Sequence, residues 1–370
     1  MSFVIITSFF LLFAYSIILI CLAIGFFKTK GFNTEEKNTQ IPFTIIICAR
    51  NEEKTIETCL YSIIQQNYAK QNIQLILIND ASIDNTLKKS EYILQNSNID
   101  YQIISNTEKK GKKKSITSSI LFAKNELIIL RDADTFTLSK NWLQTISDFH
   151  QNTKAEFIIG PINISNNVGI LWALQAIENS ILNLLSCGSN YFNSSFLCSG
   201  ANLIFSKSLF EKTTGYNSHL HIESGDDVLF LEDVKKIKHV KINYLKSTSA
   251  MVYTYPCYSF LSLVKQKIRW ASKFKFNPNR FNFILSATSF LVNLLWLISL
   301  LIIYLLPQLK FTAIVFILLK LIIDILLLFL SSSFTKNKNL NWFSLPVMIV
   351  YPFYVLIIGI LSFFFKPKWK

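Results

Sequence analysis

Two acidic residues follow a short apolar run, Glu126–Leu130, in the sequence Arg131-Asp132-Ala133-Asp134. Two carboxylates at this Asp-x-Asp spacing on a turn can face one divalent cation. Hard cations such as Mg²⁺ and Mn²⁺ take carboxylate oxygens and keep other positions for water or phosphate oxygens. Asp132 and Asp134 are therefore candidate ligands of a Mg²⁺ or Mn²⁺ ion.

A basic turn precedes these acids in the sequence. It reads Lys109-Lys110-Gly111-Lys112-Lys113-Lys114 and opens a predicted helix. Ammonium groups and free backbone N–H groups at a helix start both suit phosphate. Together with the acidic turn, they indicate a site for a metal-bridged diphosphate. The same lysines could instead form a solvated basic face near a membrane. The sequence contains no Gly-x-x-x-x-Gly-Lys-Ser/Thr motif, so ATP hydrolysis of the P-loop type is not expected.

Four short apolar runs predict the strands that must position these groups. The runs are Phe43–Cys48, Gln74–Ile78, Tyr101–Ile104 and Glu126–Leu130. Helical stretches separate them, and this alternation predicts an α/β fold with a mostly parallel sheet and helices on both faces. Ligands of such sheets bind at the carboxyl ends of the strands. We therefore expect Glu52, Asp80, Asp132 and Asp134 on one rim.

The chain is 51% hydrophobic, and its apolar residues are concentrated in blocks. Phe3–Phe27 carries no charge and is long enough to cross a bilayer. It lacks a basic leader and a cleavage site, which indicates an uncleaved anchor. Lys28 and Lys30 follow, and the positive-inside rule then places the next segment in the cytosol. The same rule is broken by Lys366, Lys368 and Lys370, unless one later block is re-entrant.

These blocks predict about four transmembrane helices and one cytosolic domain. The expected organisation is an anchor at 1–27, a cytosolic domain at 28–255, an amphipathic interfacial helix at 256–280 and about three spans at 281–370. Lys320 and Asp324, four residues apart inside a span, favour an intrahelical ion pair facing the bundle over a functional site. The net charge of +14 suits attraction to anionic membrane lipids of the inner leaflet. Nucleic acid is therefore not an expected partner.

The order of motifs along the chain resembles the family 2 inverting glycosyltransferases in their membrane-integrated branch. The motifs are ICARNEE (Ile47–Glu53), INDASIDNT (Ile78–Thr86), KKGKKKS (Lys109–Ser115), LRDADT (Leu130–Thr135), CSGANLIFSKSLFEKTTGYN (Cys198–Asn217), ESGDDVLF (Glu223–Phe230) and QKIRW (Gln266–Trp270). Three positions depart from the family pattern: Cys48 stands for a proline, Asn79 for an acid and Ala81 for a glycine. The resemblance implies the GT-A nucleotide-sugar-binding fold.

The resemblance also implies roles for individual residues. Asp134 and Asp132 would hold the metal, and Asp227 would be the general base, with Asp226 one position away as the alternative. The donor would be bound by Arg50, Glu52, Asp80, Lys112 and Asp132. The acceptor sugar and the diphosphate would be contacted by Gln266, Arg269 and Trp270. Simpler interpretations remain: Glu52 and Asp80 could cap helices, and the Arg and Trp could be membrane-interface anchors.

The implied function is that of a membrane-bound hexosyltransferase of the cell envelope or of polysaccharide biosynthesis. It would move a sugar from a nucleotide-diphosphate sugar to a lipid or lipid-linked glycan and invert the anomeric centre. The bacterial inner membrane is the expected location, with the catalytic domain cytosolic. A processive polysaccharide synthase is one alternative, although four spans offer little material for a channel. A non-catalytic nucleotide-binding scaffold is the other, which the departures at Asn79 and Ala81 keep open.

Overall fold

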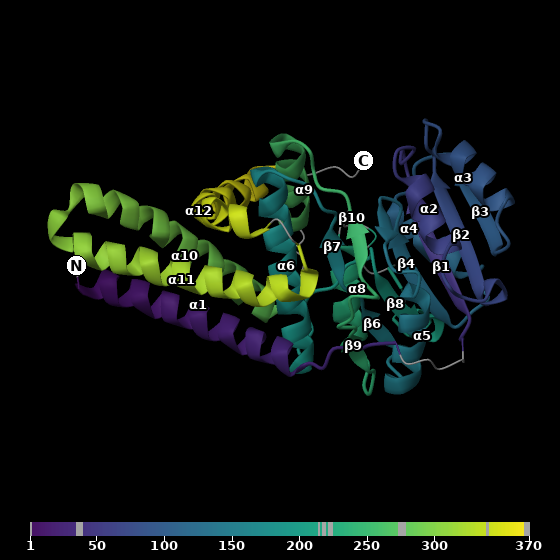
Figure 1. Ribbon diagram of the computed structural model, residues 1–370, viewed down its shortest axis with the longest axis horizontal. Helices are drawn as coiled ribbons and strands as arrows, with labels where there is room; N and C mark the ends of the chain where they lie inside the picture. The colour runs from purple at the N-terminus through teal and green to yellow at the C-terminus, as the bar shows by residue number, and fades with distance from the viewer. Residues whose placement is uncertain are drawn as a thin grey trace. The chain divides into compact units, whose positions relative to one another are not determined.

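The computed structural model describes residues 2–34, 40–213, 215–216, 220, 225–272, 279–337 and 340–365. The chain divides into two compact units (Figure 1). One contains Thr29–Ser165 and Asn193–Tyr255, and the other contains Met1–Lys28, Asn166–Phe192 and Pro256–Lys368. The continuous domain expected at 28–255 is thus interrupted, because 166–192 belongs to the unit of long apolar helices. Lys366, Lys368 and Lys370 lie outside the described residues.

The first unit is built on a seven-stranded sheet in the order β3-β2-β1-β4-β8-β6-β9. Its strands are β1 (Phe43–Ala49), β2 (Ile73–Asp80), β3 (Asp100–Asn106), β4 (Leu127–Asp132), β6 (Phe157–Ile159), β8 (Leu203–Ser206) and β9 (Ile242–Tyr244). The first four are parallel, as predicted, whereas β8 runs antiparallel to both β4 and β6. Cys48 on β1 is paired with Ile78 and with Asp132. The ends of these strands therefore reach the same edge of the sheet.

Helices cover both faces of the parallel strands. Alternate residues of β1, such as Phe43, Ile45 and Ile47, are fully buried in a core with α2 (Ile56–Ile64), α3 (Thr86–Gln95) and α5 (Trp142–Thr153). The other face is covered by α4 (Lys112–Ile120), which contacts β1 and β2. Because β1, β2 and β4 are buried on both sides, they have the continuous apolar runs that predicted them.

Smaller elements complete this unit. They are η1 (Lys70–Asn72), α7 (Lys207–Lys212), α8 (Asp226–Val234) and a three-stranded sheet of β5 (Thr135–Thr137), β10 (Val252–Thr254) and β7 (Ile162–Ile164). Strand β5 begins directly after the Asp132-Ala133-Asp134 turn. The turn is therefore held at both ends by sheet structure, at β4 before it and at β5 after it.

The second unit consists of helices. They are α1 (Ser2–Lys28), α6 (Ile170–Tyr191), α9 (Phe260–Ser272), α10 (Arg280–Leu305), η4 (Pro307–Leu309), α11 (Lys310–Thr335) and α12 (Leu340–Phe364). Helices α1, α10 and α11 lie side by side (Figure 1). Within the part of the chain that the structure describes, five helices are long and apolar enough to cross a membrane: α1, α6, α10, α11 and α12.

Helix α6 is the candidate span that the sequence analysis missed. Its mean hydropathy is 1.2 over 18 residues, against 2.2 to 3.0 in the other four candidates. Two-thirds of that stretch (67%) is buried against protein, so α6 carries polar residues that a lipid-facing helix would avoid. It contacts α1, α11 and α12. Surrounding helices thus replace lipid as its environment, which explains its weak hydropathy signal.

The predicted ion pair inside α11 is present. Lys320 Nζ lies 2.5 Å from Asp324 Oδ2, and both side chains are buried. The Tyr15 hydroxyl of α1 donates a hydrogen bond of 3.2 Å to Asp324 Oδ1. The pair is thereby compensated within the bundle, as charges between apolar helices require.

Helices α1 and α6 cross at two glycines. A Cβ added to Gly188 would lie 2.0 Å from the carbonyl oxygen of Leu22, and one added to Gly25 would lie 2.6 Å from the carbonyl oxygen of Gly188. These are backbone atoms of the facing helix, so they cannot move aside independently. Only a residue without a side chain permits this close packing of backbones, as in other tightly crossing apolar helices.

We expect Gly188→Val to destabilise the helical unit by about 1–3 kcal/mol or more, because α1 and α6 must separate. The measurement is the unfolding temperature of the full chain in detergent. Gly31→Ala is the matched control, since the added Cβ would meet only one atom, at 3.9 Å. Equal unfolding temperatures for Gly188→Val and the wild type would contradict the close crossing.

Candidate functional site

Lys112 joins two acidic segments at the carboxyl edge of the parallel strands. Its Nζ lies 2.6 Å from Asp132 Oδ1, at the end of β4, and 3.2 Å from Asp226 Oδ2, in the first turn of α8. Burial alone would lower the pKa of this ammonium, but Asp132, Asp226 and Asp227 outweigh it and raise the pKa of Lys112 well above its usual value. Lys112 is therefore a permanent positive charge between carboxylates.

Asp227 is held from the opposite side by the segment around Gly200. The Gly200 N–H donates to Asp227 Oδ2 at 3.2 Å, and the Val228 N–H donates to Asp227 Oδ1 at 2.8 Å. A Cβ on Gly200 would lie 3.1 Å from Lys112 Nζ, so glycine allows the backbone to approach the ion-paired group. The sequence analysis placed Gly200 within a motif but gave it no role. Only the tertiary structure shows that Gly200 lies next to Lys112 and Asp227.

The acidic turn after β4 is the candidate metal site. Asp132 and Asp134 are both partly exposed, while Ala133 between them is buried. Within the described residues, no cluster of three or more His, Cys, Asp or Glu side chains could hold a metal. Two carboxylates nevertheless fit Mg²⁺ or Mn²⁺, because these ions are commonly bound by one or two carboxylates plus substrate phosphates. The donor set thus suits a metal that arrives with a diphosphate.

Asp80 lies in the interior behind the basic turn. Its Oδ1 accepts hydrogen bonds from the Lys110 N–H at 2.9 Å and from Asn106 Nδ2 at 2.8 Å, and its Oδ2 accepts from the Gly111 N–H at 2.9 Å. The carboxylate is fully buried. The backbone N–H groups of Lys110 and Gly111 are therefore not free for phosphate, because they donate to Asp80. Asp80 positions the turn that carries Lys112, and its contact with a nucleoside remains a prediction.

The loops after β1 and β2 are tied together at the same rim. Arg50 Nη1 donates to the carbonyl oxygens of Asp80 at 2.6 Å and of Ala81 at 3.1 Å. The Glu52 carboxylate accepts from the Thr55 hydroxyl at 3.1 Å, just before α2. Asp84 accepts from the Thr86 N–H at 3.0 Å and thus caps α3. Arg50 and Glu52 therefore lie on the predicted rim, and their part in donor binding remains a prediction.

Ala81 stands in a backbone conformation that suits glycine. Its φ is +53°, in the left-handed region that costs an L-residue roughly 1–2 kcal/mol. We expect Ala81→Gly to stabilise this unit by about 0.5–1 kcal/mol, after the greater unfolded-state entropy of glycine is subtracted. Thermal unfolding of the two proteins measures the difference. Ala155→Gly is the control, since this buried alanine has no positive φ and should lose stability. A loss of stability in Ala81→Gly would contradict the assignment of strain.

Gln266, Arg269 and Trp270 lie on α9, in the unit of apolar helices. Within that unit, the ammonium of Lys267 lies 2.6 Å from Glu178 Oε2 on α6 and 4.1 Å from the centre of the Trp270 ring. Trp270 is thus stacked against a buried cation on one side while 37% of its surface stays exposed. The predicted contacts of Gln266, Arg269 and Trp270 with acceptor and diphosphate remain predictions.

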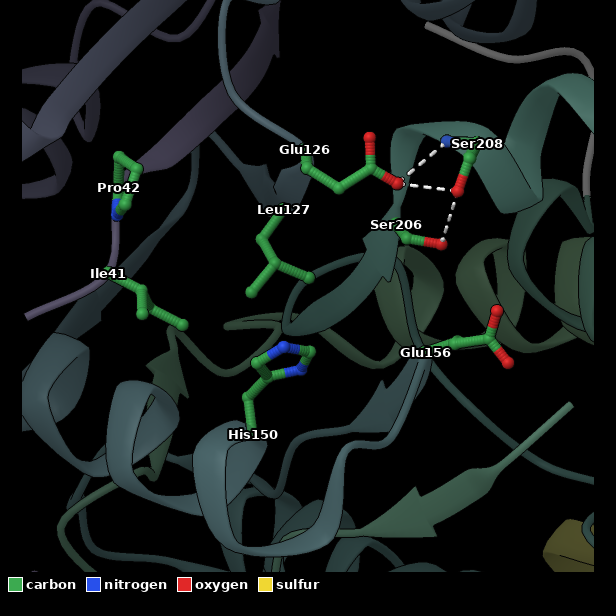
Figure 2. A pocket seen from close by; sticks show the side chains of 8 residues that line it. All are labelled: Ile41, Pro42, Glu126, Leu127, His150, Glu156, Ser206 and Ser208. Atoms are coloured by element: carbon green, nitrogen blue, oxygen red, sulfur yellow. Dashed lines mark hydrogen bonds between the residues drawn. The ribbon is translucent and has the colours of Figure 1, made fainter.

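A shallow hollow of about 350 Å³ occurs elsewhere on the sheet (Figure 2). It is lined by Ile41, Pro42, Glu126, Leu127, His150, Glu156, Ser206 and Ser208. Glu126 Oε1 accepts a 2.5 Å hydrogen bond from the Ser208 hydroxyl at its rim. The hollow lies where β1 and β4 begin, whereas Asp132 lies where β4 ends. It is therefore at the opposite edge from the acidic residues and is not the candidate site.

Sequence and structural comparisons agree with this architecture. Residues 44–214 match the family model described as Glycosyl transferase family 2. The mannosyltransferase PcManGT from Pyrobaculum calidifontis, solved in complex with GDP-Man and Mn²⁺, superposes with a TM-score of 0.54 at 14% sequence identity, covering 94% of this chain and 99% of that chain. The predicted α/β fold is thus confirmed as GT-A-like. Residues 44–214 are thus similar in sequence to family 2 glycosyltransferases.

Particular relatives match over shorter stretches. The 4,4'-diaponeurosporenoate glycosyltransferase of Staphylococcus aureus (strain N315) is 32% identical over 126 residues, which is 34% of this chain and 31% of the relative. Glycosyltransferase GlyG of Streptococcus pneumoniae serotype 4 is 26% identical over 118 residues, which is 32% of this chain and 38% of the relative. The matches thus span about a third of the length of these bacterial proteins.

Proposed function

We propose that this protein is a membrane-bound inverting glycosyltransferase that uses a nucleotide-diphosphate sugar and a divalent cation. The observation that carries the proposal is the ion pairing of Lys112 with both Asp132 and Asp226. It brings a cation suited to phosphate, an acid of the metal-binding turn and the acid pair of α8 together on one rim. A transferase that expels a nucleoside diphosphate needs these groups within reach of one another.

The donor side of the reaction follows from charge. The diphosphate would be bound by Lys112, and Asp132 and Asp134 would hold a Mg²⁺ or Mn²⁺ ion. When bound, the ion offsets negative charge on the departing diphosphate. Arg50 and Glu52 would face the nucleoside, and Asp80 would keep the Lys112 turn in place. The presence of GDP-Man and Mn²⁺ in the structural relative supports this kind of donor.

Asp227 is the proposed general base. Its carboxylate accepts hydrogen bonds from the backbone N–H groups of Gly200 and Val228, and the neighbouring Asp226 is ion-paired with Lys112. Asp227 would take the proton of the acceptor hydroxyl while its oxygen attacks the anomeric carbon opposite the leaving group. Such a single displacement inverts the anomeric centre.

The acceptor is proposed to be a lipid or a lipid-linked glycan. Five candidate spans within the described residues support a membrane location, and α9 presents apolar and basic residues in an amphipathic pattern. Gln266, Arg269 and Trp270 would contact the acceptor and the diphosphate. Because the matched relatives are bacterial, we propose the inner membrane, with the catalytic unit cytosolic and a role in the cell envelope.

The test is a screen of nucleotide sugars with the full chain purified in detergent and supplied with Mn²⁺ and bacterial lipid extract. Release of a nucleoside diphosphate is expected with one donor, together with a glycolipid of inverted anomeric configuration by NMR. The product should carry a single added sugar, whereas a ladder of lengths would make the protein a processive synthase. If no nucleotide sugar is bound or turned over, the chain is a scaffold and the proposed function is wrong.

A further inference from the structure

Arg131 is a buried cation directly behind the candidate metal-binding turn. It is the residue before Asp132, and only 1% of its surface is exposed. Its guanidinium carbon lies 4.6 Å from the centre of the Trp142 ring. Its Nε donates to the Thr135 hydroxyl at 3.1 Å and its Nη2 donates to the Ser62 hydroxyl at 3.3 Å. Among the described residues, Nη1 has no hydrogen-bond partner.

This arrangement is unfavourable for stability. A buried charge is usually compensated by an ion pair, and Arg131 has neutral hydroxyl groups as its hydrogen-bond partners instead. An arginine guanidinium stays protonated in proteins, so this position holds a buried positive charge. The preceding residues of β4, Ile128, Ile129 and Leu130, are buried and apolar. An apolar residue at this position would continue that core without the free-energy cost of burying a charge.

The contacts of Arg131 explain what the charge does. The Thr135 hydroxyl, which accepts from Arg131, donates a 2.7 Å hydrogen bond to the backbone carbonyl of Asp132. This hydrogen bond closes the turn from Asp132 to Thr135, which carries both acidic side chains. Asp132 and Asp134 repel each other when no metal is bound. A fixed positive charge behind the turn offsets that repulsion before the ion arrives.

The Trp142 ring, against which the Arg131 guanidinium packs, is held by a hydrogen bond. Trp142, the first residue of α5, is fully buried, and its Nε1 donates to Asn202 Oδ1 at 3.3 Å. Asn202 Nδ2 in turn donates to the carbonyl oxygens of Pro161 and Ala250, at 2.9 and 3.0 Å. A Cβ on Gly160 would lie 2.3 Å from Asn202 Cγ, so glycine leaves the space that this amide fills. The guanidinium therefore packs on a buried ring whose orientation is stabilised by a hydrogen bond to Asn202.

We propose that Arg131 is a positioning residue of the metal-binding turn, which holds Asp132 and Asp134 in a metal-ready arrangement. The proposal rests on the proposed function, because it assumes that the turn binds a metal with a nucleoside diphosphate. It goes beyond that function because it assigns a role to a buried residue that would contact neither the metal ion nor the nucleoside diphosphate. It also predicts opposite effects on stability and on binding when the charge is removed.

The test compares Arg131→Met and Arg131→Lys with the wild type in the full-length protein. Isothermal titration with UDP, GDP, CDP and dTDP, each with and without Mn²⁺, gives nucleotide affinity, and thermal unfolding gives stability. We expect Arg131→Met to unfold at or above the wild-type temperature, yet to bind its nucleotide at least tenfold more weakly in the presence of Mn²⁺. Arg131→Lys should recover part of that affinity. Arg280→Met, the same change at an exposed position, should leave both quantities unchanged.

Three results would overturn the inference, and they can be told apart. Unchanged Mn²⁺-dependent affinity in Arg131→Met would refute the positioning role while leaving the proposed function intact. Weaker binding accompanied by a lower unfolding temperature, without recovery in Arg131→Lys, would make Arg131 a residue of the core only. Failure of the wild type to bind any of the four nucleotides with Mn²⁺ would refute the proposed function, and the inference with it.

Discussion

Asp227→Asn is expected to lower the rate of sugar transfer by about 10²- to 10⁴-fold, the usual contribution of a general base. The amide has nearly the same shape, and its oxygen can still accept one of the two N–H groups, of Gly200 and Val228, that the carboxylate accepts, so α8 should remain folded. It cannot take up the proton of the acceptor hydroxyl. The loss should therefore appear in kcat, while KM for the donor and the affinity for the nucleoside diphosphate stay close to wild type. Initial rates at saturating donor, with unfolding temperature as a check, measure this.

Asp226→Asn is the matched comparison for this prediction. It removes one partner of Lys112 and should mainly alter binding of the diphosphate, because Lys112 then pairs only with Asp132. Its effect on kcat should be much smaller than that of Asp227→Asn. If Asp227→Asn retains full activity and Asp226→Asn does not, the base is Asp226 and the assignment of the two neighbours is reversed.

Asp134→Ala is expected to weaken Mn²⁺ binding in the presence of nucleoside diphosphate by at least about 100-fold. Changes to groups that only support a metal ligand already cost 10–100-fold, and the loss of the ligand itself should cost no less. Transfer should fall in parallel, since charge on the departing diphosphate is no longer offset. Asp134 is partly exposed on a turn, so folding should be unaffected. The signal of free Mn²⁺ in electron paramagnetic resonance measures binding directly.

Glu91→Ala on α3 is the control for this second prediction, because it removes an exposed carboxylate away from the turn. It should leave Mn²⁺ binding and transfer unchanged. Wild-type Mn²⁺ affinity in Asp134→Ala would show that the acidic turn is not the metal site. Transfer by the wild type without any divalent cation would show that the reaction does not require a metal.

Strands β1, β2 and β4 could be predicted because they are buried on both faces of the sheet. A strand such as Phe43–Ala49 has no solvent-facing side, so it must be a short continuous apolar run, and such runs are visible in a sequence. The polar residues after each run could be placed on one rim because the carboxyl ends of parallel strands lie at one edge of the sheet. The antiparallel strand β8 gave no comparable signal of direction, because a four-residue apolar segment can pair either way.

The limits of prediction are clearest at α6 and Asp80. Helix α6 is packed among other helices and is thus too polar to resemble a lipid-facing span, so neighbours distant in sequence decide its environment. The sequence indicated Asp80 as a residue of the donor rim, and it did not show that the carboxylate accepts the backbone N–H groups of Lys110 and Gly111. A motif shows that an acid is present at a strand end, and it does not show which donors the fold brings to that acid.

The sequence by itself determined the class of fold, the candidate membrane helices α1, α10, α11 and α12, and the edge of the sheet where the acidic residues gather, because these depend on local periodicity and strand order. Only the tertiary structure decided which charges meet. It paired Lys112 with Asp132 and Asp226, placed Gly200 against Asp227 and buried Arg131 on Trp142. These contacts join segments up to about a hundred residues apart, and the free energy of each depends on burial and on partners that no single segment contains.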